Sequence, residues 1–284
     1  MTRTAHASPP SAERLRRFRQ AYGEHRAAEG RGAGGEAELL ALPYLRRGPQ
    51  AEAWAVRARS FDAFSARVVA PAARASAPRP LRIADLGAGN GWLCYRLRST
   101  GYEAVAVDVR DDAVDGLRAA DAYAAHSFAM RGRMFDRIAA SFDALPLSSA
   151  SFDLAVFNAS LHYAFDLRAT LEEAVRIVRR GGRIVILDSP FYETEAAGLA
   201  MVEEKGLAAV ERFGDLADDL AALPFVEFLT AERLAAASAG DGRALSWHRH
   251  RVRYPLGYEA RPLLARLRRR RAPSRFDVWE AMVP

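Results

Sequence analysis

The stretch Ile83-Ala-Asp85-Leu-Gly87-Ala-Gly89-Asn-Gly91 decides how the rest of the chain is interpreted. An apolar run leads into a turn of alternating glycines, and residues with helical periodicity follow at once. Glycine lets the backbone turn sharply and approach a ligand closely, and the first turn of a helix offers unpaired amides. The stretch therefore predicts a strand, a ligand-binding turn and a helix in direct succession.

The spacing of this turn argues against a dinucleotide. The glycines recur as Gly-x-Gly-x-Gly with Asp85 two residues before them, whereas a dinucleotide turn has the spacing Gly-x-Gly-x-x-Gly. An acidic side chain beside the turn repels phosphate and attracts a cation. A cofactor that carries an amino-acid group therefore suits this turn better than a pyrophosphate does.

A second acidic residue, Asp108, closes the next expected strand. It lies 21 residues after Gly87, where a carboxylate can accept hydrogen bonds from both hydroxyls of a ribose. The alternative role is to cap the following helix, for which Asp111 and Asp112 are also well placed. We favour the ribose role, so the expected cofactor contains a nucleoside.

Short apolar runs alternate with amphipathic segments along most of the chain. Strands are expected at 81–86, 104–109, 136–140, 152–158, 183–188, 245–252 and 276–283. Helices are expected at 92–99, 111–125, 167–180 and 231–237, the third of them ending at Gly181-Gly182. This alternation predicts an α/β fold with a Rossmann-like, doubly wound, mostly parallel seven-stranded sheet.

The first eighty residues predict helices. Phe18 and Tyr22 recur at helical spacing after a capping type of residue at Ser11. The glycine-rich run 30–35 interrupts this pattern, and a longer helix is expected over 54–68. These helices form an N-terminal extension of the sheet domain.

Three prolines in 70–80 end the second helix and mark the expected domain boundary. We therefore divide the chain into an N-terminal helical extension, 1–80, and a sheet domain, 81–284. The stretch 191–229 is longer than the sheet needs and predicts a helical insertion. Extension and insertion are expected to form a lid over the binding site, and the alternative is that they pack as satellites.

The composition limits the class of protein. With 284 residues, of which 50% are hydrophobic and 27% charged, the chain is neither disordered nor a disulfide-built miniprotein. Cys94 is the single cysteine and is interpreted as a buried apolar residue, so neither a disulfide nor a cysteine-based metal site is expected. No apolar run is long enough for a signal peptide or a membrane span, which predicts a soluble, cytoplasmic protein.

The net charge of +6 has two interpretations. A solvated, arginine-rich surface is favoured, because Lys205 is the only lysine and the abundance of arginine and alanine fits codon bias. A site for a polyanion is the alternative. The run from Arg266 to Arg271 is likewise either solvated or an anion-binding patch.

With these motifs in place, the chain resembles the class I S-adenosylmethionine-dependent methyltransferases, especially their small-molecule and quinone-type branch. The motifs that carry the resemblance are Ile83 to Gly91, Val105 to Asp108, Ser141 to Leu147 with Ser151 to Leu154, Asn158 to His162, and Gly181 to Asp188. They stand in the family's order. The resemblance implies S-adenosylmethionine as the cofactor and methyl transfer as the reaction.

The resemblance also assigns parts of the cofactor to residues of this chain. It implies that the loop from Gly87 to Gly91 holds the methionine part, Asp108 the ribose, and 141–142 the adenine. Ser141 stands where the family often has an aspartate that binds the adenine amino group. The implied cofactor-binding residues are Asp85, Gly87, Ala88, Gly89, Gly91, Asp108, Val109, Ser141, Phe142 and Asn158.

Catalytic residues are expected just beyond the fourth strand. Methyl transfer is an in-line displacement in a water-poor pocket, and it requires neither a metal nor a covalent intermediate. His162 is the expected general base or else a surface histidine, and Tyr163 either positions the acceptor or packs. Asp188 either binds the acceptor or caps a segment. His248 and His250 share a strand face, where a solvated role is favoured over a metal site.

The sequence thus predicts a small-molecule methyltransferase that acts on oxygen or carbon. Asn158 is followed by Ala-Ser and not by Pro-Pro-Tyr, the family's signature for amino-group methylation. The alternatives are an RNA methyltransferase, drawn from the basic flanks, and a non-catalytic S-adenosylmethionine-binding regulator or assembly protein. The aromatic residues expected to cover the acceptor, from 36–69 and 191–229, are Tyr44, Trp54, Phe61, Phe64, Phe191, Tyr192 and Phe225.

Overall fold

A computed structural model describes residues 12–28, 30, 35–130, 132–214, 217–218, 223–239 and 244–284. Ser11, the expected helix cap, lies outside the described residues, as does most of the glycine-rich run 30–35.

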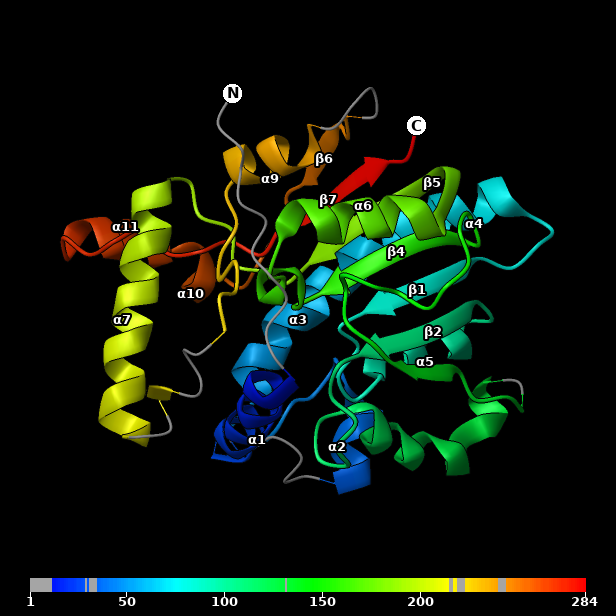
Figure 1. The fold of residues 1–284 in the computed structure, drawn as a ribbon, viewed down its shortest axis with the longest axis horizontal. Helices are drawn as coiled ribbons and strands as arrows, with labels where there is room; N and C mark the ends of the chain where they lie inside the picture. The colour runs from blue at the N-terminus through cyan, green and yellow to red at the C-terminus, as the bar shows by residue number, and fades with distance from the viewer. Residues whose placement is uncertain are drawn as a thin grey trace.

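The centre of the molecule is a seven-stranded sheet with the strand order β3-β2-β1-β4-β5-β7-β6 (Figure 1). The strands are β1 (Arg82–Leu86), β2 (Glu103–Asp108), β3 (Asp136–Ala139), β4 (Phe152–Asn158), β5 (Val178–Leu187), β6 (Trp247–His250) and β7 (Val278–Met282). β1 to β5 run parallel, and β7 lies antiparallel between β5 and β6. The expected doubly wound, mostly parallel fold is confirmed.

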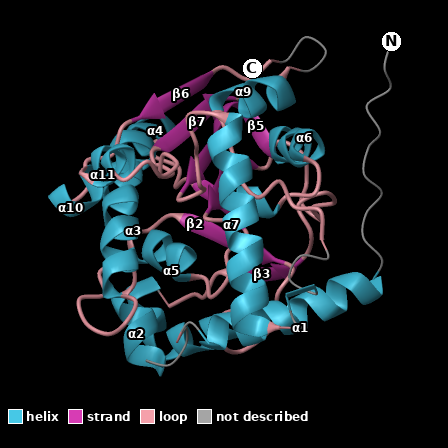
Figure 2. Cartoon of the chain, turned by 90° about the vertical axis from the view of Figure 1, so that its left-hand side faces the viewer, coloured by secondary structure: helices cyan, strands magenta, loops and turns pink. Residues whose placement is uncertain are grey.

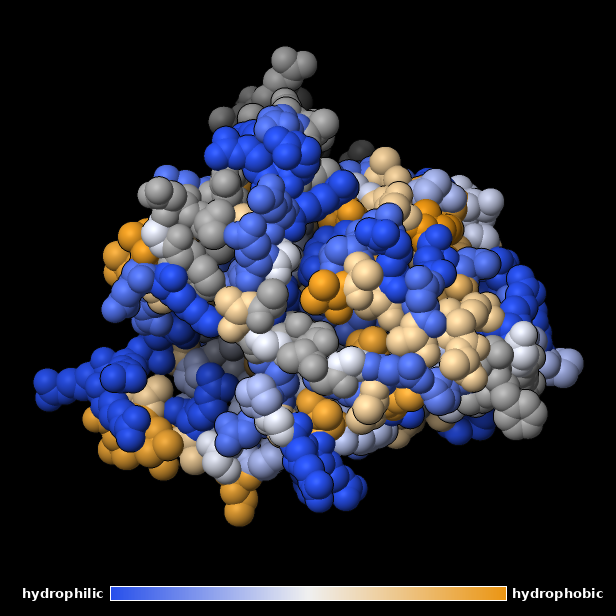
Figure 3. Space-filling view, turned by 90° about the horizontal axis from the view of Figure 1, so that it is seen from below, coloured by the Kyte–Doolittle hydropathy of each residue, from blue (hydrophilic) through white to orange (hydrophobic). Residues whose placement is uncertain are grey.

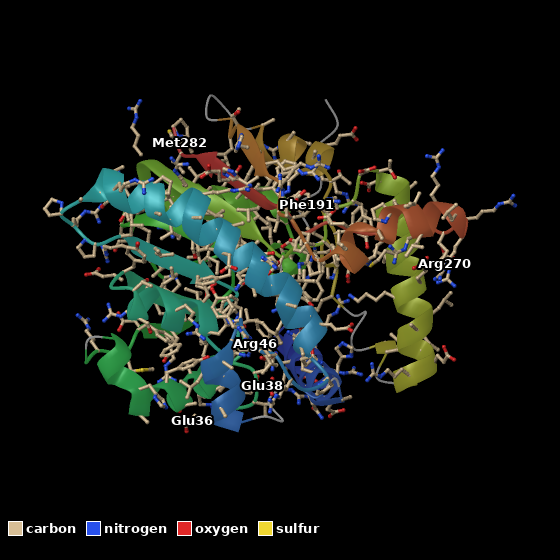
Figure 4. All side chains as sticks on the ribbon, turned by 180° about the vertical axis from the view of Figure 1, so that it is seen from behind. Glu36, Glu38, Arg46, Phe191, Arg270 and Met282 are labelled. Carbon is tan, nitrogen blue, oxygen red and sulfur yellow. The ribbon has the colours of Figure 1, made fainter. Side chains whose placement is uncertain are left out.

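Helices cover both faces of this sheet. The α-helices of the described residues are α1 (Ala12–Ala28), α2 (Gly35–Ala41), α3 (Ala51–Phe64), α4 (Ala70–Ser76), α5 (Trp92–Ser99), α6 (Leu167–Ile177), α7 (Glu195–Phe213), α9 (Ala231–Ser238), α10 (Leu256–Glu259) and α11 (Arg261–Leu267). α3 and α5 pack on one face and α6 and α9 on the other. Figure 4, drawn from behind, shows α3 running across the sheet.

Residues of β4 alternate between the two cores. Leu154 and Val156 belong to the core under α3, while Ala155 and Phe157 belong to the core under α6. Every residue of β4 is buried, as expected for a central strand of a parallel sheet covered on both faces.

The helix expected over 111–125 is wrong. The chain passes through turns after Asp111, and a 3-10 helix, Leu117–Met130, follows. The Asp112 carboxylate accepts hydrogen bonds from the amides of Val114 and Asp115 at 3.0 and 2.9 Å, which closes a turn there. Local bonding by an aspartate side chain competes with helix formation in this way.

The helix expected to stop at Gly181-Gly182 ends earlier, at Ile177. The last carbonyls of α6, on Arg176 and Ile177, accept hydrogen bonds at 2.8 Å from the amides of residues 150 and 151, and β5 starts directly afterwards. Gly182 therefore lies inside the strand. A Cβ there would stand 2.6 Å from the Asp153 carbonyl oxygen, so the close approach of β4 requires glycine.

The second N-terminal helix passes Pro71 and ends at Ser76, within the expected proline-rich segment 70–80. α3 continues through a π-helical turn, Ser65–Val69, into α4, whose second residue is Pro71. The Ala70 amide donates to the Ser65 carbonyl oxygen in the π-helical turn, so the helix is continuous up to Pro71. Phe64 and Val68 of this continuous helix are fully buried in the same core as Ile83, so the N-terminal helices and the sheet share one core.

Two peripheral helices meet at one edge of the molecule. The Arg212 side chain near the end of α7 donates to the Ala28 carbonyl oxygen at the end of α1, at 3.2 Å. Figure 2 shows α7 in front with α1 below it. None of the helices within the described ranges combines the length and the apolar character that a bilayer crossing needs.

The arginine run after α11 divides into one paired residue and several exposed ones. Arg271 donates to the Glu204 carboxylate of α7 at 2.7 Å, while residues 268–270 are exposed and Arg270 points away from the body (Figure 4). Leu263 and Leu267 on α11 are 62% and 71% exposed. Figure 3 shows hydrophobic residues grouped among hydrophilic ones at this left-hand edge.

One buried carboxylate joins three sequence-distant segments. Asp153, 2% exposed on β4, accepts hydrogen bonds from Arg79 at 2.7 and 2.9 Å, from the Arg82 amide at 2.8 Å, and from Arg179. Burial alone would raise the pKa of Asp153, but these donors outweigh it and lower the pKa to about 2.

We expect Asp153→Asn to reduce the free energy of unfolding at neutral pH by about 1 to 3 kcal/mol, because the donors lose a charged acceptor. The folded pKa lies below the ordinary 3.8, so this stabilisation is present above about pH 4 and is lost as the pH falls toward 2. Urea unfolding from pH 7 to 3 measures it. Glu103→Gln, which removes a half-exposed pair with Arg82 at 3.3 Å, is the matched control and should cost less than about 1 kcal/mol. Equal losses in both variants would contradict this account.

Candidate functional site

The carboxyl ends of β1, β2 and β4 open into one pocket of about 970 Å³, a volume that includes its solvent-open mouth. Eight of the ten expected cofactor-binding residues line it: Gly87, Ala88, Gly89, Asp108, Val109, Ser141, Phe142 and Asn158. Asp85 lies fully buried behind the glycine turn, and Gly91 begins α5. Ligands of open α/β sheets bind at this edge.

Backbone geometry brings the glycine turn close to β2 and to Ser160 and leaves no room for a side chain at Gly87. The amides of Gly87 and Ala88 donate to the Val107 carbonyl oxygen at 2.7 and 3.0 Å, which ties the turn to β2. Gly87 has φ +84°, and a Cβ there would stand 2.3 Å from Cβ of Ser160. Only glycine fits this position, because both the backbone conformation and the neighbouring side chain exclude a Cβ.

Asp108 ends β2 with its carboxylate at the pocket wall. Oδ2 accepts from the Gly89 amide and Oδ1 from the Arg110 amide, both at 2.8 Å. Burial raises the pKa of Asp108, which these two amides oppose. Each carboxylate oxygen retains a second acceptor position, so a pair of hydroxyls can still bind there.

Two buried oxygen atoms at this end have no hydrogen-bond partner within the described part of the chain. They are Oδ1 of Asp85 and Oδ1 of Asn158. Oδ2 of Asp85 accepts from the Cys94 thiol at 3.7 Å, and burial raises the pKa of Asp85 to about 8. Buried acceptors without donors are costly unless a ligand supplies them. Asn158 lines the pocket, so its oxygen, together with the glycine cradle, fits a ligand that carries an amino group, as the methionine part of S-adenosylmethionine does.

A charged cluster links helix α1 to the glycine turn. Asp115 accepts from the Asn90 side chain at 3.0 Å and from Arg26 of α1 at 3.2 Å, and an Arg110 nitrogen lies 3.6 Å away. All four residues line the pocket. The sequence analysis missed this role for Arg26, Arg110 and Asp115, because the pairing joins segments that no local pattern relates.

The other end of the pocket is aromatic. Its rings are Phe18, Tyr22, Trp54, Trp92, Tyr163, Phe165 and Phe225. Phe225 contacts Phe18 at 4.9 Å and Phe165 at 5.2 Å between ring centroids, and the Tyr22 hydroxyl donates to that of Tyr163 at 3.1 Å. α1 therefore closes this end against residues that follow β4.

The expected set of covering aromatic residues was partly wrong. Trp54 and Phe225 line the pocket, but the other five do not belong to its described lining. Phe64 is in the sheet core, and Phe191 and Tyr192 pack on Trp279 and Phe228. Phe18 and Tyr22 supply cover from α1 instead, ahead of the expected range 36–69. Their helical spacing was visible in the sequence, but the direction in which they point was not.

His162 lies behind Tyr163 and is absent from the described lining of the pocket. Its ring centroid is 4.2 Å from that of Tyr163, and Nδ1 is 3.5 Å from the Ser189 hydroxyl. Burial, aided by the charges of Lys205 and Arg57, lowers the pKa of His162 to about 3. The imidazole is therefore neutral at physiological pH and a weak base. Its catalytic role stays a prediction.

We expect His162 to make stability depend on pH in the acid range. Its folded pKa of about 3 lies below the ordinary 6.5, so its stabilisation is complete above pH 6.5 and is lost as the pH falls toward 3. Between pH 7.5 and 5 the free energy of unfolding of the parent should fall by about 2 kcal/mol more than that of His162→Gln. Urea unfolding measures this, with His248→Gln on exposed β6 as the control. Identical dependence of the unfolding free energy on pH in the parent and in His162→Gln would contradict this expectation. A turnover loss of about 10²-fold or more in His162→Gln would support the base role.

The remaining candidate residues lie apart from the pocket. The rings of His248 and His250 are 4.5 Å apart, and His250 bonds to Glu280 at 2.9 Å. No group of three or more His, Cys, Asp or Glu suited to a metal ion occurs in the described ranges. Asp188 ends β5 with φ +50°, and burial raises its pKa to about 6.

Comparison with known proteins agrees with this geometry. A family model described as a methyltransferase domain matches residues 84–186. The malonyl-[acyl-carrier protein] O-methyltransferase of Hahella chejuensis is 32% identical over 123 residues, which is 42% of this chain and 41% of the relative. A ubiquinone/menaquinone biosynthesis C-methyltransferase of Methylobacterium nodulans is 32% identical over 133 residues, 45% of this chain and 49% of that one. The matches thus span about half or less of these relatives.

Solved structures share the fold at low sequence identity. The 1,6-didemethyltoxoflavin-N1-methyltransferase of Burkholderia thailandensis, solved with its substrate and S-adenosylhomocysteine, has a TM-score of 0.51 and 17% identity over 98% of this chain and 94% of its own. The magnesium protoporphyrin IX methyltransferase of Synechocystis has a TM-score of 0.50 and 14% identity over 81% of this chain and 86% of its own. These two structures share the fold of this chain, and residues 84–186 match the methyltransferase domain model.

Proposed function

We propose that the protein transfers a methyl group from S-adenosylmethionine to oxygen or carbon of a small-molecule acceptor. The observation that carries the proposal is the division of one pocket into two chemically different ends. The glycine turn, Asp108 and Asn158 form a polar end suited to a nucleoside and an amino acid. Rings from α1, α3 and the segment after β4 form an apolar end suited to an acceptor.

The polar end of the pocket would bind the cofactor, and the aromatic end would exclude water from the reaction. The bound cofactor supplies a methyl group on a sulfonium. Asp108 accepts the ribose hydroxyls, the turn at Gly87 admits the methionine part, and Asn158 offers its partnerless oxygen to a donor on the ligand. Phe18 and Tyr22 exclude water from the reacting atoms, which favours the displacement. α1 and Trp54 of α3 thus act as part of a lid, and α7 from the 191–229 insertion supports α1.

Calorimetry on the full chain tests the cofactor assignment. S-adenosylhomocysteine should bind and NAD should not, and Asp108→Ala should weaken binding by about 30-fold or more because two charge-assisted hydrogen bonds are lost. Asp111→Ala, on an exposed carboxylate of the same loop, is the matched control and should leave the affinity unchanged. Tighter binding of NAD, or equal affinities of both variants, would remove the basis of the proposal.

Turnover separates the catalytic proposal from its alternatives. Methyl transfer to any member of a small-molecule panel excludes a purely regulatory role. An RNA enzyme would bind RNA at nanomolar affinity in physiological salt, whereas we expect weak binding that falls steeply with salt. We also propose a cytoplasmic location, which the single cysteine supports because a reducing compartment suits such a composition.

A further inference from the structure

Arg57 is a charged residue of the aromatic end of the pocket, where Arg26 and Arg110 also lie over the Tyr22 ring, at 5.3 and 5.0 Å from its centroid. It lies on α3 one turn after Trp54, and its guanidinium carbon is 4.9 Å from the Trp54 ring centroid. Burial is the largest cause of the pKa shifts of His162 and Asp188, and the charge of Arg57 lowers the pKa of both groups. The helix that carries Arg57, α3, contacts β5. This position is separate from the Arg26 and Arg110 pair, which lies on Asp115.

The rings around Arg57 suit a flat acceptor. Phe165 stacks on Phe225 with an angle of 14° between ring planes, while Tyr163 meets Phe225 edge to face at 85°. Trp54 and Trp92 meet at 89° with 5.6 Å between centroids. Walls made of ring faces and edges give planar aromatic ligands their favourable geometries. An aliphatic acceptor would bury apolar area here, but it would make none of the stacked or edge-to-face ring contacts that orient an aromatic ligand.

The described lining of the pocket offers no base of ordinary strength for removing a proton from the acceptor. Asp108 is engaged with two backbone amides, and Asp115 with Asn90 and Arg26. Burial raises the pKa of Tyr22, whose hydroxyl acts as a donor to Tyr163. His162 stands behind the wall with a depressed pKa. An acceptor that reaches the pocket already ionised needs no such base.

We propose that the acceptor is a planar aromatic or heteroaromatic compound with an acidic hydroxyl, which binds as the oxyanion beside Arg57 and is methylated on that oxygen. This inference rests on the proposed function and names its substrate class. The hydroxyl proton leaves to solvent before binding. A lone pair of the oxyanion then forms the new carbon–oxygen bond, while the carbon–sulfur bond breaks and its electron pair stays on sulfur.

Charge explains both binding and release in this scheme. A guanidinium flanked by an aromatic ring is weakly hydrated and binds oxyanions well in a site of low polarity. The reaction converts the oxyanion into a neutral ether and the sulfonium into a neutral thioether, so both products lose their electrostatic attraction. Arg57 therefore discriminates between ionised and neutral acceptors.

The test uses the full chain saturated with S-adenosylhomocysteine and two probes of similar shape. At pH 8, 4-nitrophenol is largely ionised, whereas phenol is not. Calorimetry should find 4-nitrophenol bound about tenfold or more tightly than phenol. Arg57→Gln should abolish this preference and Arg57→Lys should keep part of it, while Arg59→Gln, an exposed arginine on the same helix, should keep it fully.

With S-adenosylmethionine in place of the product, mass spectrometry should detect the methyl ether of 4-nitrophenol and little product from cyclohexanol. Failure of S-adenosylhomocysteine to bind would overturn the proposed function itself. If it binds, three results would overturn the inference alone: equal affinities for the two phenols, an unchanged preference in Arg57→Gln, or benzoate methylated in preference to 4-nitrophenol.

Discussion

Gly87→Ala should reduce the affinity for S-adenosylhomocysteine at least about 100-fold, equivalent to about 2.8 kcal/mol. The new methyl group would stand 2.3 Å from Cβ and 2.9 Å from Oγ of Ser160, at a backbone angle of φ +84°. The turn must shift away from the Val107 carbonyl oxygen that now accepts its two amides. The cradle that receives the cofactor would then be lost. Calorimetry and thermal unfolding of the same preparations measure both consequences.

Gly132→Ala is the matched control for Gly87→Ala. Gly132 also has positive φ, +74°, but a Cβ there meets nothing within 4 Å. It should cost about 1 kcal/mol of stability through backbone strain and leave cofactor affinity intact. Adding Ser160→Gly to Gly87→Ala removes the colliding atom and should restore part of the affinity. Equal effects of the two single alanine variants would contradict the close-approach explanation.

Deleting residues 1–28 should lower methyl transfer by about 10³-fold while changing the affinity for S-adenosylhomocysteine by less than about tenfold. The deletion removes Phe18 and Tyr22 from the aromatic end, which opens the reacting atoms to water. Asp115 still has Asn90 and Arg110 beside it, so the polar end keeps its shape. Single-turnover kinetics with a saturating acceptor measures the loss.

The deletion must stop before α3. Trp54, Phe64 and Val68 are buried in the sheet core, so removal of residues 1–69 would unfold the protein and test nothing about the lid. In the full chain, Phe18→Ala should reproduce part of the loss, and Arg19→Ala, exposed on the same helix, should not. Full turnover by the shortened chain would show that α1 is dispensable for chemistry.

Local patterns explain why the sequence could predict that the residues at the glycine-turn end of the pocket lie together. A strand, a glycine turn, a helix and a strand-terminal aspartate lie within one short stretch, and their contacts follow from chain geometry alone. The Gly87 amide donates to the Val107 carbonyl oxygen of the adjacent strand β2, and the Gly89 amide donates to Asp108 at the end of that strand. The sequence therefore contains nearly all the information needed for this end.

The acceptor end depends on contacts between distant segments. Tyr22 meets Tyr163 across 141 positions, and Arg26 meets Asp115 across 89. Helical spacing placed Phe18 and Tyr22 on one face, but nothing local says which surface that face covers. The predicted end of α6 was wrong for a related reason. The last carbonyl oxygens of α6 accept hydrogen bonds from the amides of residues 150 and 151, and β4 approaches Gly182 closely. These contacts between distant segments outweigh the tendency of glycine to end a helix.

The placement of β7 between β5 and β6 also governs the order in which the sheet can be completed. β6 is made before β7, yet among the described strands it pairs with β7 alone, so it has no strand partner while the ribosome is still adding residues 278–282. Until then β5 presents an open edge, the kind of surface that pairs with other nascent chains. Shortened or split versions of the protein for expression must therefore keep this strand.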